Sequence, residues 1–174
     1  MKLNALLPAF ALAASLVSGA ALAQTTTQTD ATPSDGAFIS TAISSGLAEV
    51  NEAQLALQRS HNPAVLAFAR RMEKDHSLAN SQFKALAETK NYPYSSDLAA
   101  ADKTKMSQLS ALSSAAFDRA YASGEVTDHE QAVALFQKES SAGGDLDVRS
   151  LAARTLPTLQ DHLKMAQSLA AQLR

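Results

Sequence analysis

The chain contains no cysteine and no tryptophan, and only six of its 174 residues are glycine. Without cysteine, disulfide bonds, thiol catalysis and cysteine-ligated metal sites are excluded, and so is a lipid attached to a cysteine after a bacterial signal. Few glycines, together with abundant alanine and leucine, are typical of helix bundles rather than of β-sandwiches or β-barrels.

A strong charge of either sign is also missing. The formal net charge is −2 at pH 7, and the chain has no run of basic residues. This balance argues against a nucleic-acid partner. The sequence also lacks a phosphate-binding loop and a nucleophile elbow. The composition therefore predicts a helical protein without a recognisable enzyme motif.

Residues 1–23 have the three parts of a secretory signal peptide. Lys2 provides the positive start, residues 5–17 are apolar, and Ala21-Leu22-Ala23 is a small-x-small cleavage site. The apolar part is too short and too interrupted for a membrane anchor, and no later segment is apolar enough to span a bilayer. We expect cleavage before Gln24 and a periplasmic protein. Peripheral association with the outer membrane is compatible with this prediction.

Residues 24–35 are polar and rich in threonine, which predicts a flexible tether. The folded domain is therefore expected over residues 36–174. Within it, apolar residues recur every three to four positions in four long segments, as in amphipathic helices. Capping residues precede these segments, for example Asn62-Pro63 and Asp145. The predicted long helices cover about residues 35–59, 63–89, 114–140 and 146–173.

A shorter apolar pattern follows Ser96 and reaches Leu112. About 17 helical residues span roughly 25 Å, close to the height of a bundle, so this segment can carry the chain from one end to the other. The prediction is an all-α, four-helix bundle with an additional shorter crossover helix. Pro157 lies inside the last helix, where it either kinks the helix or begins a new one capped by Thr155.

Three histidines occupy positions where an apolar residue is expected. His76, His129 and His162 each lie near the midpoint of a long helix, as does Glu49 in the first helix. Midpoints of helices of similar length share one level of a bundle, whichever way each helix runs. One carboxylate and three imidazoles should therefore meet in a central layer. Glu73 precedes His76 by three residues and is expected to point to the same place.

Several short motifs resemble one known family. These motifs are Phe38, Gly46–Val50, Phe68–Met72 followed by Asp75-His76, Phe117–Tyr121, His129, and Leu156–Leu159 followed by His162. They resemble the bacterial ferritin-like domain of unknown function 4142, whose members are often labelled outer membrane or exported proteins. The resemblance covers about Gly36 to Ala170. It implies a ferritin-like four-helix fold in an exported protein, and it implies no particular activity.

The di-iron pattern of ferritin-like proteins is only half present. It needs one carboxylate from each of two helices and a Glu-x-x-His motif from each of the other two. Glu73-x-x-His76 matches once, but the residues three positions before the other two histidines are Val126 and Leu159. The missing ligands argue against ferroxidase or oxygenase chemistry.

Several interpretations of the central layer remain open. It is a structural polar network, with the histidines paired to Glu49, Asp75, Asp118 or Tyr121, or it is a site for one zinc, copper or iron ion. The candidate metal ligands are Glu49, Glu73, His76, His129 and His162. The favoured prediction is a non-enzymatic exported protein whose layer is structural or binds a metal ion weakly. The first alternative is a degenerate di-iron-type enzyme or metal-storage protein.

The second alternative is an envelope module that binds a protein partner or forms a homo-oligomer. An exposed apolar patch on the crossover helix would indicate such a binding module.

Overall fold

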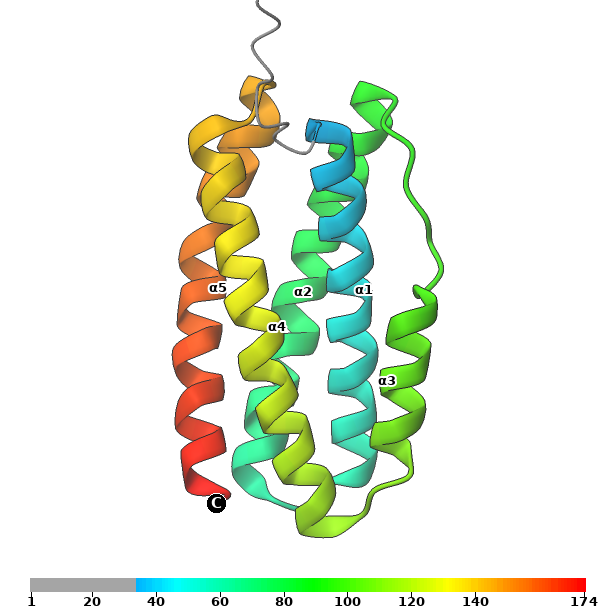
Figure 1. Ribbon diagram of the computed structural model, residues 1–174, viewed down its shortest axis with the longest axis vertical. Helices are drawn as coiled ribbons and strands as arrows, with labels where there is room; N and C mark the ends of the chain where they lie inside the picture. The colour runs from blue at the N-terminus through cyan, green and yellow to red at the C-terminus, as the bar shows by residue number, and fades with distance from the viewer. Residues whose placement is uncertain (1–33) are drawn as a thin grey trace, which may run out of the picture.

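The computed structural model describes residues 34–174, so the predicted signal peptide and most of the predicted tether lie outside the described residues. This part of the chain forms five helices and no strand, which confirms the all-α prediction (Figure 1). The helices are α1 (Asp35–Arg59), α2 (Pro63–Lys90), α3 (Ala100–Ser110), α4 (Ser114–Ala142) and α5 (Leu146–Gln172).

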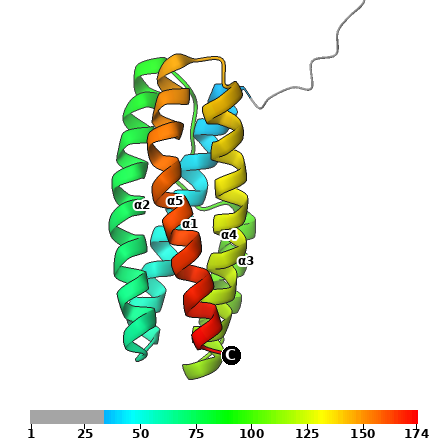
Figure 2. The ribbon, with the colours of Figure 1, turned by 90° about the vertical axis from the view of Figure 1, so that its left-hand side faces the viewer.

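The four long helices form two antiparallel pairs. α1 packs mainly against α2 and α4 against α5, and contacts of α1 with α4 and of α2 with α5 close the bundle (Figures 1 and 2). Between the pairs, the crossover returns the chain to the end where α2 began, so that α4 runs parallel to α2. The predicted ferritin-like four-helix bundle with a shorter crossover helix is thereby confirmed.

The ends of the helices follow from local side-chain chemistry. The Ser34 hydroxyl accepts a hydrogen bond from the Ala37 N–H, and the Asn62 side chain accepts one from Ala64 at 2.9 Å. These contacts satisfy backbone donors that lack a partner in the first turn. At the other end of α2, Asn91 adopts the left-handed conformation with φ of 55°, as is common one residue beyond a helix.

The crossover helix is shorter than the sequence predicts. α3 has 11 residues, and the chain between Asn91 and Ala99 is not helical, so extended chain covers much of the distance between the two ends (Figure 1). The Ser95 hydroxyl accepts a hydrogen bond from the Asp97 N–H and donates one to the Asp97 carbonyl. Such local hydrogen bonds compete with those of a helix, and α3 begins only at Ala100.

Pro157 does not divide the last helix. α5 continues through it from Leu146 to Gln172, and the Thr155 hydroxyl donates to the Leu151 carbonyl instead of capping a new start. The alternative of two consecutive helices is therefore wrong.

The apolar core consists of two clusters, one towards each end of the bundle. The upper cluster, at the end of the bundle where α1 begins (uppermost in Figure 1), includes Phe38, Phe83 and Phe136, and the lower cluster, at the opposite end, includes Phe68 and Tyr121. On each of the four long helices, the residues between the two clusters include a buried histidine or glutamate, whereas the buried Glu139 lies near the end of α4, outside this level. A polar layer therefore crosses the middle of the bundle.

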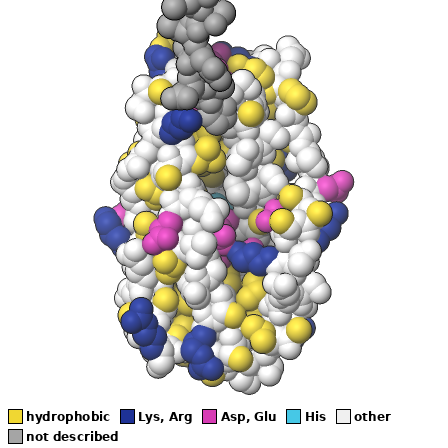
Figure 3. Space-filling model, in the orientation of Figure 1, with side chains coloured by type: hydrophobic (Ala, Val, Ile, Leu, Met, Phe, Trp, Pro, Cys, Tyr) yellow, Lys and Arg dark blue, Asp and Glu magenta, His cyan; other side chains and the backbone are white. Residues whose placement is uncertain are grey.

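The surface mixes charged and apolar side chains, and acidic and basic groups gather half-way along the face shown in Figure 3. The large hydrophobic side chains that are exposed in the described residues are Leu78, Leu146 and Met165, which belong to α2 and α5. The crossover helix α3 carries none of them, so the sign expected of a partner-binding module is missing there. No helix between residues 34 and 174 combines the length and hydropathy that a membrane span requires.

Candidate metal centre

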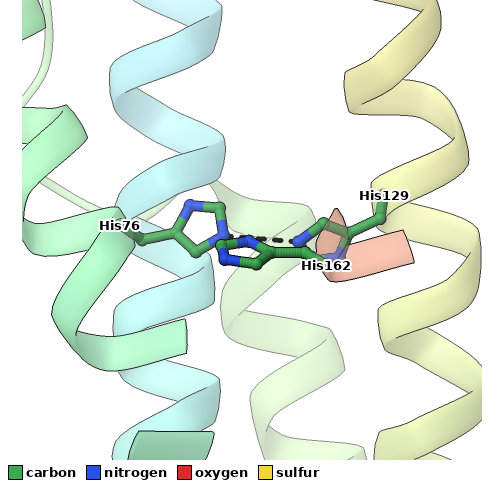
Figure 4. Close-up of side chains that lie close together, drawn as sticks. All are labelled: His76, His129 and His162. Carbon is green, nitrogen blue, oxygen red and sulfur yellow. Dashed lines mark hydrogen bonds between the residues drawn. The ribbon is translucent and has the colours of Figure 1, made fainter. Parts of the chain in front are cut away.

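Three imidazole rings meet in the polar layer. His76 from α2, His129 from α4 and His162 from α5 form a nearly equilateral triangle, with ring centroids 5.2–5.4 Å apart (Figure 4). Their side chains are almost completely buried, at 7%, 1% and 1% exposure. One nitrogen of each ring lies within 4.8 Å of the corresponding nitrogens of the other two, close enough for all three to bind one ion.

The contacts of His129 determine which of its nitrogens faces the triangle. Its Nδ1 lies 2.8 Å from the backbone carbonyl of Glu125, so Nδ1 carries the hydrogen and donates it. The Nε2 lone pair then points at His76, whose Nε2 is 3.3 Å away. A histidine metal ligand is commonly oriented by this kind of bond from its second nitrogen.

A carboxylate orients His162 in the same way. Its Nε2 lies 3.0 Å from Asp75 Oδ2, and Arg71 binds the same carboxylate from one turn earlier on α2. Nε2 therefore carries the hydrogen, and Nδ1 keeps its lone pair. That Nδ1 atom is buried and has no hydrogen-bond partner. A buried acceptor without a partner is costly in a purely structural network, but a metal ion would satisfy it.

Burial keeps the three rings neutral. Burial, and then the neighbouring rings, lower the pKa of His76 to about 3. Burial also lowers the pKa of His129 to about 4, against the hydrogen bond to the Glu125 carbonyl. The pKa of His162 is lowered by burial too, although Asp75 opposes the shift. Neutral imidazoles at pH 7 are the form that binds a metal ion.

Two carboxyl groups lie beside His129. Glu49 from α1, Glu125 from α4 and His129 each place a ligand atom within 4.8 Å of the other two. Burial raises the pKa of Glu125 to about 8, and burial together with the Glu125 carboxylate raises the pKa of Glu49 well above its usual range. The two groups therefore share at least one proton near neutral pH when no cation is bound.

These shifts predict the pH at which the metal-free protein is most stable. Below pH 6.5, His76 and His129 are protonated in the unfolded chain but stay neutral in the native protein. The free energy of unfolding therefore falls as the pH decreases. Above pH 4.5 native Glu125 retains a proton that the unfolded chain releases, so stability falls as the pH rises towards 8. The free energy of unfolding should therefore be greatest between about pH 4.5 and 6.5. Urea titrations with a chelator, from pH 4 to pH 8.5, measure this; stability that still increases above pH 7 would contradict it.

A cavity of about 320 Å³ leads to this layer between α1, α2 and α4. Its wall includes His76 and His129 of the histidine triangle and Glu49 of the carboxyl pair, whereas His162 and Glu125 do not line it. Near it, Lys105 of α3 binds Asp128 and lies 2.8 Å from Glu52 Oε2. The cavity offers a small ion or water a route to the otherwise buried layer.

Four of the five residues predicted as metal ligands lie in this layer, and Glu73 does not. His76, His129 and His162 form the triangle, and Glu49 lies beside His129. Glu73 instead accepts a hydrogen bond from the Gln54 side chain at 3.1 Å, in an exposed position. Three residues of helix correspond to a rotation of about 300°, so Glu73 is turned about 60° from His76, towards α1.

Other expectations about single residues also change. Glu52 is 2% exposed, and Lys105 of the crossover helix α3 binds its carboxylate. Of the partners considered for the histidines, only Asp75 makes a hydrogen bond to one of them within residues 34–174. Asp118 lies eleven residues before His129, about 16 Å along the helix axis, and is too far away to join the site.

One residue of the layer was not among the predicted ligands. Glu125 lies four residues before His129, on the same face of the helix, but this spacing departs from the Glu-x-x-His pattern used to choose ligands. Asp75 was one of the predicted partners of the histidines, and its bond to His162 joins α2 and α5. No signal in the local sequence shows such a bond, because it depends on how α2 and α5 pack.

A family model described as "Domain of unknown function (DUF4142)" matches residues 20–169. The chain belongs to this family. A comparison with curated proteins finds no match. Among solved structures, the chain is similar to the crystal structure of a DUF305 fragment from Deinococcus radiodurans, with a TM-score of 0.72 and 16% sequence identity. The similarity covers 80% of this chain and 97% of that one, and at this identity it shows a shared fold alone.

Proposed function

We propose that this DUF4142 protein is a non-enzymatic metal-binding protein of the periplasm, in which His76, His129 and His162 hold one transition-metal ion. The observation that carries the proposal is the convergence of three buried, neutral imidazoles from three helices. Imidazole nitrogen suits zinc and copper best among the common metals, and iron and nickel also bind it. Three protein ligands leave a coordination position for water from the cavity.

The arrangement favours a metal site over a purely structural network. In a structural network the buried polar atoms should be paired, because each unpaired one costs roughly 1–3 kcal/mol. Here His162 Nδ1 has no partner, and His76 Nε2 and His129 Nε2 lie 3.3 Å apart, a separation that suits a hydrogen bond as well as two ligands of one ion. Two of the rings are oriented by bonds from their outer nitrogens, as in known metal sites. Both features are explained by an ion between the rings.

Export to the periplasm rests on the sequence of residues 1–23, with its basic start, apolar segment and Ala21-Leu22-Ala23 site. N-terminal sequencing of protein from a periplasmic extract tests it. A mature chain beginning at Gln24 would support export, and a chain that keeps Met1 in the cytoplasm would contradict it.

Zinc titration of the mature protein tests the metal site directly. An ion that binds only the native state raises the free energy of unfolding, by about 2.7 kcal/mol at a free concentration 100 times the dissociation constant. We therefore expect zinc or copper to raise the thermal midpoint in a concentration-dependent way, and metal analysis to find bound ion after gel filtration. If neither metal binds and neither changes the midpoint, the proposal is wrong.

Replacing Asp75 by asparagine should weaken zinc binding about 10–100-fold, the usual effect of removing a residue that orients a histidine ligand. The variant leaves His162 in place but removes the charge that holds its Nε2–H. Isothermal titration at pH 7 measures the change. Asp161→Asn is a matched control, because this neighbour of His162 is exposed and pairs with Lys164; equal affinities of the two variants would contradict the role of Asp75.

A further inference from the structure

The carboxyl pair beside His129 is a second feature of the layer and consists of different side chains. Glu125 is completely buried, and Glu49 is 7% exposed. They approach each other from two helices, α1 and α4, that pack side by side. His129 does not complete this group as a ligand, because its Nδ1–H is already donated to the Glu125 carbonyl oxygen.

No basic side chain neutralises this pair in the part of the chain that the structure describes. The nearby ammonium group of Lys105 binds Glu52 and Asp128. Both carboxylate oxygens of Glu125, and Oε2 of Glu49, are buried without a hydrogen-bond partner. The hydroxyl of the fully buried Tyr121, one turn before Glu125 on α4, also lacks a partner.

Such a group of atoms needs a neutralising partner. A carboxylate moved out of water loses several kcal/mol of solvation unless it is paired, and two close carboxylates also repel each other. A shared proton joins one oxygen of each carboxyl group and leaves the other oxygen of each group without a partner. A divalent cation would neutralise both groups and coordinate several of the oxygen atoms that lack a partner.

We propose that Glu49 and Glu125 bind a second divalent cation, of the oxygen-preferring class that includes manganese and ferrous iron, next to the histidine site. Carboxylate and water oxygens are the ligands these ions prefer, whereas the three imidazoles suit zinc and copper. Glu49 lies on the wall of the 320 Å³ cavity, which supplies the ion and the water for its remaining positions. The Tyr121 hydroxyl donates a hydrogen bond to the Glu125 carboxylate once the ion fixes it.

Manganese is the probe for this site, because Mn²⁺ has an electron paramagnetic resonance signal that distinguishes free from bound ion. We expect the wild-type mature protein to bind one Mn²⁺ per chain, and Glu125→Gln to bind it at least tenfold more weakly. Glutamine keeps the shape of the side chain and removes its charge. Glu139→Gln is the matched control, since Glu139 is another buried glutamate of α4, fourteen residues and about 21 Å along the axis from Glu125.

Two further variants test whether the carboxyl pair binds its ion independently of the histidine site. Glu49→Gln should repeat the loss of Mn²⁺ binding if Glu125→Gln fails to fold by circular dichroism. His162→Ala should lose zinc and retain Mn²⁺, because His162 is not part of the carboxyl pair. Zinc binding without any Mn²⁺ binding in the wild type would overturn the second site and leave the first intact. Equal Mn²⁺ affinity in the wild type and both glutamine variants would also overturn it.

Discussion

Alanine at position 129 should abolish the stabilisation by zinc. The wild-type protein is expected to gain about 2.7 kcal/mol in its free energy of unfolding at a zinc concentration 100 times its dissociation constant. In His129→Ala the same zinc concentration should raise it by less than about 0.5 kcal/mol, because affinity then falls by more than the 10–100-fold typical of supporting residues. Thermal or urea unfolding at pH 7, with zinc or with chelator, measures both values.

His129 is the most informative ligand to remove. It is 1% exposed, it faces His76 across 3.3 Å, and its ring centroid is 5.4 Å from that of His162. Without it the two remaining imidazoles offer only two nitrogens. The variant also loses packing in the metal-free state, so the zinc-dependent difference is the quantity to compare rather than absolute stability.

His61→Ala is the control for this experiment. His61 lies in the short exposed connection between α1 and α2 and contributes nothing to the central layer. Its removal should leave the zinc-dependent gain within about 0.5 kcal/mol of the wild-type value. A full zinc effect in His129→Ala, or its loss in His61→Ala, would show that the ion binds elsewhere.

The height of the site along the bundle axis could be predicted, because it depends only on the lengths of the four long helices. The four long helices have 25, 28, 29 and 27 residues, so their midpoints meet at one height once they pack side by side. Gly46, three residues before Glu49, also lets α2 come close to this part of α1, since a Cβ atom there would lie 2.3 Å from Asn80 Oδ1.

The rotation of each helix about its axis could not be predicted in the same way. Glu73 and Asp75 flank His76 on opposite sides, and helical spacing alone does not decide which of them meets a neighbouring histidine. The packing of α2 between α1 and α5 turns Glu73 towards Gln54 and Asp75 towards His162. Glu52 depends in the same way on α3, whose position is set by a nonhelical connection.

Phe83→Ala should cause the largest loss of stability, about 3–5 kcal/mol in the free energy of unfolding. Phe83 is 1% exposed, and its ring packs edge-on against Phe38 and Phe136, with centroids 5.8 and 5.6 Å away. Truncation removes both aromatic contacts and leaves a cavity in the upper cluster, which rigid helices fill only in part. Urea unfolding of the metal-free variant measures the loss.

Leu78→Ala is a suitable control for this change. Leu78 lies on the same helix but is 59% exposed, so its truncation should change the free energy of unfolding by no more than about 0.5 kcal/mol. A loss below about 1.5 kcal/mol in Phe83→Ala would contradict the tight aromatic packing of the upper cluster.

The same variant tests whether the core and the metal site are independent. Phe83 follows His76 by seven residues, about 10 Å along α2, and belongs to the upper apolar cluster rather than to the polar layer. Effects at sites this far apart usually add within about 0.5 kcal/mol. Phe83→Ala should therefore keep the wild-type gain from zinc although it is much less stable. A smaller gain would mean that the three imidazoles are held in place by the aromatic cluster and not only by Asp75 and the Glu125 carbonyl.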